Sequence, residues 1–86
     1  MRILTHRTFD KTLKQLPVKL KKKIHRQVEI FLENPIDQRL NNHQLNGIYL
    51  GYRSIDITGD WRIIFEEIDH QTVKFVNIGT HSQLYG

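Results

Sequence analysis

The sequence contains no cysteine, which excludes disulfides, thiolate metal ligands and a cysteine nucleophile. It also has no apolar run long enough for a signal peptide or a membrane-spanning helix. We therefore expect a soluble, cytoplasmic protein without a membrane partner. No internal repeat, low-complexity tract or linker interrupts the 86 residues, so we expect a single domain over residues 1–86.

Acidic residues are almost missing from the N-terminal third of the chain. Residues 1–26 carry nine Lys or Arg and one Asp, whereas residues 27–86 carry four basic and eight acidic side chains. This asymmetry favours a polyanionic partner, most often nucleic acid, although a solvated helix surface is the alternative. The residues that we expect to bind RNA are Lys19, Lys21, Lys22, Lys23, Arg26 and Arg62.

Periodic apolar residues predict two helices after a short first strand at residues 2–4. Thr8 can cap the first helix, and Pro17 suits the first turn of the second. The second helix is expected to end at residues 34–35, because the residue before a proline disfavours the helical conformation. The short connection predicts an antiparallel helix pair. The apolar stripes are Phe9, Leu13 and Leu16, followed by Leu20, Ile24, Val28, Phe31 and Leu32.

Three runs of β-type residues predict an antiparallel meander in the second half of the chain. They cover about residues 49–57, 61–68 and 72–78, and short turns separate them. We therefore expect an α+β domain with the element order β-α-α-β-β-β. Its two N-terminal helices would pack on one face of a small twisted antiparallel sheet.

Alternation along the first of these runs assigns side chains to the two faces of the sheet. It places Arg53, Ile55 and Ile57 on one face. Ser54 and Asp56 then lie on the other face.

A histidine stands where the last predicted strand ends, in the segment Gly79-Thr80-His81. Histidine commonly titrates near neutral pH, so at a strand end it is either a structural group or a proton donor or acceptor. In a strand that continues without a bulge, His81 would share a face with Phe75 and Asn77. A glycine within a strand often marks a bulge, which leaves this assignment open.

The segment HQLNGIYLGYRSIDITGDW, followed near the C-terminus by GTHSQLYG, resembles the RelE superfamily of type II toxin–antitoxin toxins. Within that superfamily the YafQ-like branch is the most similar. The fold order agrees along essentially the whole chain. The matching positions are His43, Leu45, Gly47, Gly51, Tyr52, Arg53, Asp60, Trp61, Gly79, Thr80, His81 and Leu84.

The resemblance implies a ribosome-dependent mRNA endonuclease, or mRNA interferase, that cuts the codon in the ribosomal A site. It implies that no metal or other cofactor is needed. The message's own 2′-hydroxyl would attack the adjacent phosphorus, leaving a 2′,3′-cyclic phosphate and a 5′-hydroxyl. It also implies a cognate acidic antitoxin, and binding to operator DNA only as the toxin–antitoxin complex.

Four candidate catalytic residues correspond to positions of the family: His81, Tyr85, His43 and Asp60. We expect His81 to protonate the leaving 5′-oxygen and His43 to supply a second titrating group. Tyr85 can stack on a base or hydrogen-bond to the RNA backbone. The alternatives are that Asp60 is only a turn residue and that His43 is only an exposed loop histidine.

Three further residues could supply charge. Arg53 or Arg62 can hold the phosphate through two hydrogen bonds, and Asp56 can orient an imidazole or act as a base. Asp56 stands where relatives have a histidine, and Ser54 where they often have an aspartate, which leaves the division of acid and base roles open. Trp61 is expected in the core rather than as a platform for a base.

Two other functions stay open at this point. One is a ParE-like toxin that shares the fold but inhibits DNA gyrase, and the other is a degenerate, non-catalytic toxin that binds antitoxin or nucleic acid. The paired histidines and the GTHS motif favour RNA cleavage. No metal site is proposed, because His6, His25 and His70 have no partners at a recognisable spacing.

Overall fold

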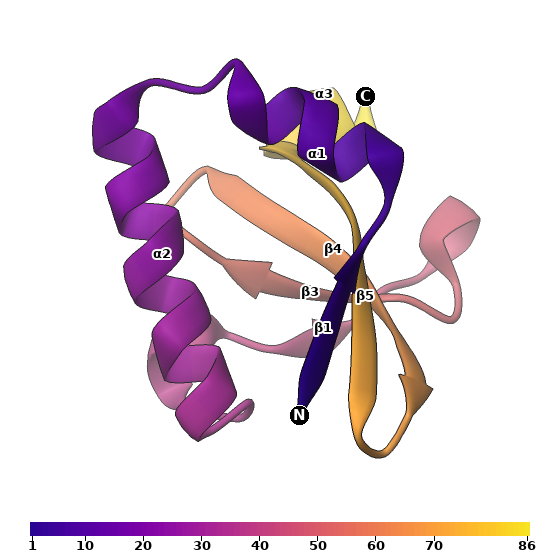
Figure 1. The fold of residues 1–86 in the computed structure, drawn as a ribbon. Coiled ribbons are helices and arrows are strands. Elements are labelled where there is room, and N and C mark those ends of the chain that lie inside the picture. Colours follow the sequence, from indigo (N-terminus) through magenta and orange to yellow (C-terminus); the bar gives the residue numbers. More distant parts are fainter.

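The computed structural model describes residues 1–86 and contains one five-stranded sheet with the strand order β1-β5-β4-β3-β2 (Figure 1). The strands are β1 (Arg2–Thr5), β2 (His43–Gln44), β3 (Arg53–Asp56), β4 (Trp61–Asp69) and β5 (Thr72–Thr80). The helices are α1 (Arg7–Lys14), α2 (Val18–Glu33) and α3 (His81–Tyr85), with short 3-10 turns η1 (Gln38–Leu40) and η2 (Gly47–Tyr49). The predicted α+β class is confirmed. None of the helices has the length and hydropathy needed to cross a bilayer.

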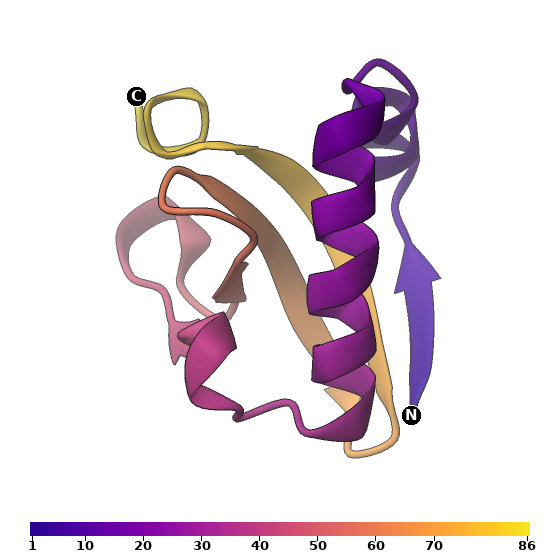
Figure 2. The same cartoon turned by 90° about the vertical axis from the view of Figure 1, so that its left-hand side faces the viewer.

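The first two helices cover one face of the sheet, as the sequence predicts (Figures 1 and 2). Phe9 of α1 packs on Phe75 of β5 with ring centroids 5.4 Å apart, and Phe31 of α2 packs on Phe65 of β4 at 5.2 Å. These contacts join the helices to the sheet in one main core. Its buried residues are Phe9, Ile24, Phe31, Leu40, Ile55, Ile57, Ile63, Phe65, Val73, Phe75 and Ile78.

The helices do not form the predicted antiparallel pair. Figure 1 shows α1 beside the upper end of α2 and at a steep angle to it. Pro17, with an extended backbone (φ −61°, ψ 150°), turns the chain between them. Because Phe9 packs on Phe75, α1 lies against β5 instead of alongside α2.

The helix ends and one apolar stripe also differ from the prediction. The cap of α1 is His6, whose Nδ1 accepts a hydrogen bond from the Thr8 N–H at 3.0 Å, so Thr8 lies inside the helix. Leu32 is 47% exposed, because it lies about 100° around the helix from the buried Phe31. Gln27, one helical turn before Phe31 on the same side of α2, is buried instead and is only 5% exposed.

The sheet is mixed, whereas the prediction was an antiparallel sheet. β1 pairs with β5 in parallel, and the other three pairs of strands are antiparallel. β1 leads into helices, and only a tight hairpin connection would have imposed antiparallel pairing. The meander of β3, β4 and β5 is confirmed.

The first strand of the meander is shorter than predicted. It covers Arg53–Asp56, because Gly47 (φ 65°) and Gly51 (φ 94°) adopt left-handed conformations that break the extended run. Tyr49, which lies between the two glycines, and Tyr52, which follows Gly51, pack against the core cluster on the second face of the sheet.

That second face carries a smaller core under α3, a helix that the sequence analysis did not predict (Figure 2). Leu45, Ile64 and Leu84 form its buried centre. A hypothetical Cβ on Gly79 would lie 3.2 Å from Leu84, tighter than ordinary van der Waals contact, so glycine leaves room for the close approach of α3.

The structure decides the orientation of His81, which the sequence left open. A bulge lies opposite Ile64 and Phe65, so Asn77 pairs with Ile64 while Phe75 pairs with Phe65. Phe75 and Asn77 therefore point to opposite faces of the sheet, and His81 begins α3 instead of continuing β5.

Candidate active site

The face of the sheet beneath α3 carries a charged pair. Asp56 of β3 and Arg62 of β4 are cross-strand partners, with Arg62 Nε 3.4 Å from Asp56 Oδ1. The Arg62 side chain is 22% exposed and the Asp56 side chain 24%, so solvent screens the pair less than it would screen a surface ion pair. Asn41 donates from Nδ2 to Asp56 Oδ2 at 3.3 Å. Asp56 is therefore held from two sides.

His43 lies beside this pair on β2, where Ser54 is its cross-strand partner. Its Nδ1 is 2.7 Å from the backbone oxygen of Asn41. A carbonyl oxygen can only accept, so Nδ1 carries a proton and donates it. In the neutral ring Nε2 is then left unprotonated, which makes it a proton acceptor.

Sequence reasoning missed Asn41, which positions both His43 and Asp56. Its backbone is left-handed (φ 47°, ψ 49°), a conformation that asparagine tolerates better than most residues. The Asn41-Asn42 doublet before the short β2 strand is the signal that would have indicated such a turn.

His81 and Tyr85 lie on α3, one helical turn apart. Their rings pack obliquely with centroids 4.8 Å apart. The backbone N–H of His81 donates to the backbone oxygen of Asp60 at 3.1 Å and to its Oδ1 at 3.3 Å. Asp60 therefore fixes where α3 begins and touches the backbone of His81, not its imidazole. The imidazole itself is exposed and has no hydrogen-bond partner.

Four buried polar atoms on this side of the sheet lack a hydrogen-bond partner: Ser54 Oγ, Asp56 Oδ1, Arg62 Nε and Tyr85 OH. Asp56 and Arg62 form an ion pair, but the angles at their closest atoms do not allow a hydrogen bond between Nε and Oδ1, so both atoms lack a hydrogen-bond partner. Buried polar groups in native proteins are nearly always paired, so this concentration needs an explanation. Three of the four atoms are donors, which suits an anionic ligand.

Arg53, predicted as a phosphate-binding residue, is not part of this cluster. It shares a face with its cross-strand partner Phe65, which belongs to the main core on the opposite side of the sheet. Its Nε donates to Asn42 Oδ1 at 2.9 Å. The cation beside the predicted catalytic residues is therefore Arg62.

The other predicted RNA-binding residues lie on α2, away from this face. Lys19, Lys22, Lys23 and Arg26 line a groove beside the helix. Lys21 instead donates from Nζ to the backbone oxygen of Lys14 at 3.2 Å.

In the strand order, β3 with Asp56 and β4 with Arg62 lie between β2, which carries His43, and β5, which leads into His81. From β2 to β5 the sheet spans three inter-strand spacings, or about 14 Å. No group of three or more His, Asp or Glu side chains lies close enough together to hold a metal ion.

Residues 1–86 match a protein family described as the bacterial toxin of type II toxin–antitoxin system, YafQ. The mRNA interferase toxin YafQ of Escherichia coli K12 is 33% identical over 52 residues, which are 60% of this chain and 55% of that toxin. The sequence match thus spans about half the length of that relative.

Solved structures resemble the chain over its full length. The crystal structure of YafQ from Escherichia coli BL21(DE3) superimposes with a TM-score of 0.81 at 25% identity, covering 100% of both chains. The Escherichia coli DinJ-YafQ toxin-antitoxin complex gives a TM-score of 0.78 at 25% identity, covering 98% of this chain and 96% of that chain.

The fold and the polar face under α3 thus place the molecule in the class of RelE-superfamily toxins. The resemblance that the sequence motifs indicated is confirmed. Since the family match covers every residue, this protein belongs to the YafQ family of bacterial type II toxins.

Proposed function

We propose that this toxin is a ribosome-dependent mRNA interferase, which cuts the A-site codon by attack of the message's 2′-hydroxyl without a metal ion. The main support is the surface under α3, where Arg62 pairs with Asp56 on the two strands between β2, which carries His43, and β5, which leads into His81, and where several buried donors lack partners. The Escherichia coli relative that is named an mRNA interferase adds weight to the proposal.

In the proposed reaction His43 Nε2 accepts the proton of the 2′-hydroxyl while the 2′-oxygen bonds to phosphorus. The bond from phosphorus to the 5′-oxygen breaks, and His81 donates a proton to that oxygen. The products are a 2′,3′-cyclic phosphate and a 5′-hydroxyl. Placing acid and base on opposite sides of the phosphate suits an in-line displacement, and each positioned group contributes roughly 10²–10⁴-fold.

The remaining residues stabilise the charge on the phosphate or position the catalytic side chains. Arg62 offsets the charge that develops on the phosphate oxygens, and Asp56 orients the guanidinium. Tyr85 supports the His81 ring and offers its surface to a base. Asp60 holds the start of α3 through the His81 N–H.

The ribosome supplies what this small site lacks, which is an ordered substrate. Holding the message in a reactive geometry can replace many chemical groups, since positioning alone is worth several orders of magnitude. The uncompensated basic residues of α2 provide contacts to RNA phosphates on the ribosome, those of ribosomal RNA as well as those of the message, and this function belongs in the cytoplasm.

A cognate antitoxin is the second partner that we propose. The solved DinJ-YafQ complex supports it, because that toxin shares this fold over nearly its whole length. We expect operator DNA to be bound only by the toxin–antitoxin complex.

His81 provides the sharpest test. His81→Ala should slow single-turnover cleavage of an A-site codon by on the order of 10²-fold or more, measured by primer extension. His81→Gln should be nearly as slow, because it retains hydrogen bonding but cannot titrate. His70→Ala, at the exposed turn after β4, is the matched control and should cut normally.

Several outcomes would contradict the proposal. Wild-type cleavage by His81→Ala, or a loss explained by unfolding, would make His81 structural. Equal cutting of free RNA, or inhibition by EDTA at levels that leave ribosomes intact, would remove ribosome dependence or metal independence. Gyrase-linked DNA breaks without RNA cleavage would indicate a ParE-like toxin, and binding without any cleavage a degenerate one.

A further inference from the structure

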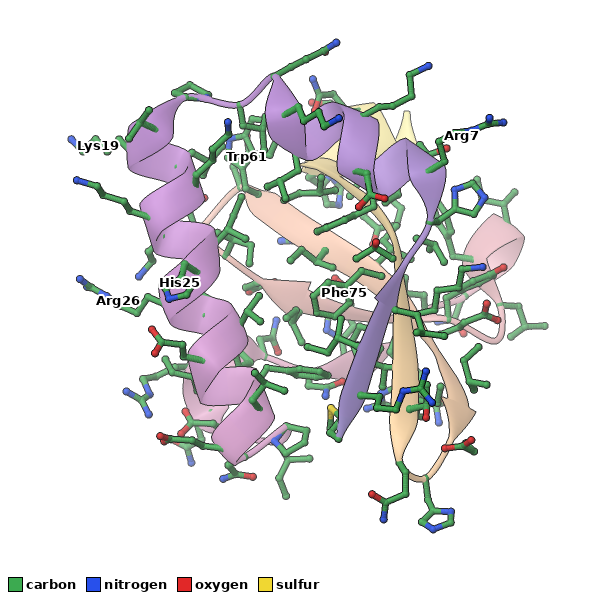
Figure 3. All side chains as sticks on the ribbon, viewed as in Figure 1. Arg7, Lys19, His25, Arg26, Trp61 and Phe75 are labelled. Atoms are coloured by element: carbon green, nitrogen blue, oxygen red, sulfur yellow. The ribbon has the colours of Figure 1, made fainter.

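The largest groove of the molecule is not on the candidate active face. It lies between α2 and the turn that joins β3 to β4, and its volume is about 670 Å³. Four cationic side chains and two apolar ones shape it: Lys19, Lys22, Lys23 and Arg26, with Leu20 and Trp61. Figure 3 shows Lys19 and Arg26 extending from α2 and Trp61 between α2 and α1.

The cations of this groove are uncompensated. No acidic residue lines it, and none of the four takes part in an ion pair. Positive charge concentrated along a groove attracts a polyanion.

Trp61 makes the groove more than a charged surface. The sequence analysis expected a core residue, and part of the ring does pack against the main core, but Trp61 is only partly buried and also lines the groove. Its backbone is held, because its N–H donates to Thr58 Oγ1 at 3.0 Å and its oxygen accepts from the Ile57 N–H at 2.8 Å. A fixed aromatic surface beside cations is a stacking platform for a nucleobase.

The groove is continuous in sequence with the candidate active site. Asp60, which holds the His81 N–H, directly precedes Trp61, so their Cα atoms are about 3.8 Å apart. Thr58, at the other end of the same turn, lines the groove. An RNA strand that leaves the scissile phosphate at His81 therefore reaches the groove by passing around this one turn.

We propose that the groove binds single-stranded message next to the cleaved phosphate, with a base stacked on Trp61 and phosphates on the α2 cations. The choice of message as the source rests on the proposed function. Single-stranded RNA fits because it offers unstacked bases and charge together, whereas a duplex hides its base faces.

The first experiment uses tryptophan fluorescence, because Trp61 is the chain's single tryptophan. The toxin is titrated with a single-stranded RNA of about 12 nucleotides, a length that spans one small binding site. Its 2′-hydroxyls carry O-methyl groups, so it cannot be cleaved. We expect saturable quenching that weakens as salt rises. Inorganic polyphosphate should displace the RNA without quenching, and a duplex of the same sequence should quench less.

Variants with changes inside and outside the groove test whether the RNA binds there. The double change Lys22→Gln and Lys23→Gln should weaken RNA binding by about tenfold and lower the salt slope by roughly one to two units. Lys11→Gln with Lys14→Gln removes the same charge from α1, outside the groove, and should bind nearly as wild type. Because both Trp61 variants lack the chain's single tryptophan, their binding is measured by fluorescence anisotropy of an end-labelled RNA. Trp61→Phe should retain binding, whereas Trp61→Leu should lose about tenfold or more, with circular dichroism to confirm folding of both.

A crosslinking experiment tests the source of the RNA. On ribosomes programmed with a message carrying 4-thiouridine beside the A-site codon, the α2 and β3–β4 turn peptides should crosslink to the message. Crosslinks of these peptides to ribosomal RNA alone would overturn the proposal.

Other outcomes would also overturn it. Absent quenching, or equal losses in the two lysine pairs, would show that the groove does not select RNA. An acidic amphipathic peptide that quenches Trp61 and displaces the RNA at lower concentration would make it a peptide site. Quenching that persists in a protein unable to cleave any message would refute the proposed function alone, because the titration needs no chemistry.

Discussion

Gly79→Ala should damage the active face without adding any charge or polar group. Gly79 is buried in β5 beneath α3, and its backbone conformation is one that alanine can adopt. The obstacle is space, since the added Cβ would lie 3.1 Å from Gln83 Oε1 and 3.2 Å from two carbon atoms of Leu84. These contacts are tighter than ordinary van der Waals distances.

Neither neighbour can give way freely. Leu84 is 5% exposed and packs against Leu45 and Ile64. Gln83 Oε1 accepts the Thr80 N–H at 2.9 Å, so moving it breaks the cap of α3. Overpacking of this kind costs roughly 1–3 kcal/mol. In a domain of this size each kcal/mol lowers the melting temperature by about 4–8 °C.

The effect on activity should exceed the effect on stability. α3 carries His81 and Tyr85, so a shift of the helix by a fraction of an ångström moves both candidate catalytic side chains. Misplacement of about 1 Å can cost on the order of 10²-fold in rate. We expect single-turnover cleavage by Gly79→Ala to fall by roughly 10- to 100-fold, at temperatures where the protein remains folded.

Gly59→Ala is the matched control, because its added Cβ meets no heavy atom within 4 Å. It should change the free energy of unfolding by less than about 0.5 kcal/mol. Adding Leu84→Ala to Gly79→Ala should cost less than the sum of the single changes, because it removes the atoms that the new Cβ meets. If Gly79→Ala matched Gly59→Ala in melting temperature and cleavage, the close-approach explanation would be wrong.

Three further predictions concern other polar contacts. Gln27→Leu should lower the free energy of unfolding in urea by roughly 1–3 kcal/mol, because the Gln27 Nε2 donates to the backbone oxygens of Arg39 and Asp56; an unchanged urea midpoint would contradict this. Hydrogen bonds and charge from Arg39 lower the pKa of Asp37 from 3.8 to about 2, so its contribution to folding should be complete above about pH 4 and lost as the pH falls through about 2. Carboxyl NMR titration should show this low pKa, and Arg39→Gln should return it toward 3.8; the same titration in both proteins would refute the cause. Thr80→Val should speed hydrogen exchange of α3 amides and cost about 0.5–2 kcal/mol, and unchanged exchange would show that the capping box is dispensable.

Local sequence chemistry was enough to predict most of the elements. The spacing of Phe9, Ile24 and Phe31 predicted helices that bury one face, and the alternation around Ile55 and Ile57 predicted a strand that meets them. Short turn segments predicted the meander. These features depend on neighbours within a few residues, so the sequence alone contains them.

The parts that were missed depend on contacts between distant residues. The parallel pairing of β1 with β5 joins the two ends of the chain, and no local pattern specifies it. The burial of Gln27 became favourable only because two backbone oxygens from elsewhere accept its amide hydrogens. The five-residue α3 is too short to be stable alone, and its packing over Gly79 holds it in place.

The candidate site divides in the same way. By itself the sequence determined the residue types and, through the GYR, DW and GTHS motifs, the family to which they belong. Only the tertiary structure decided which arginine accompanies the histidines. In the sequence, Arg53 and Arg62 are equally good candidates for the phosphate-binding arginine. Strand pairing turns Arg53 toward the helix-covered face of the sheet and places Arg62 beside Asp56. The physical reason is that a strand sends alternate side chains to opposite faces, and the face that becomes the site depends on what packs over it.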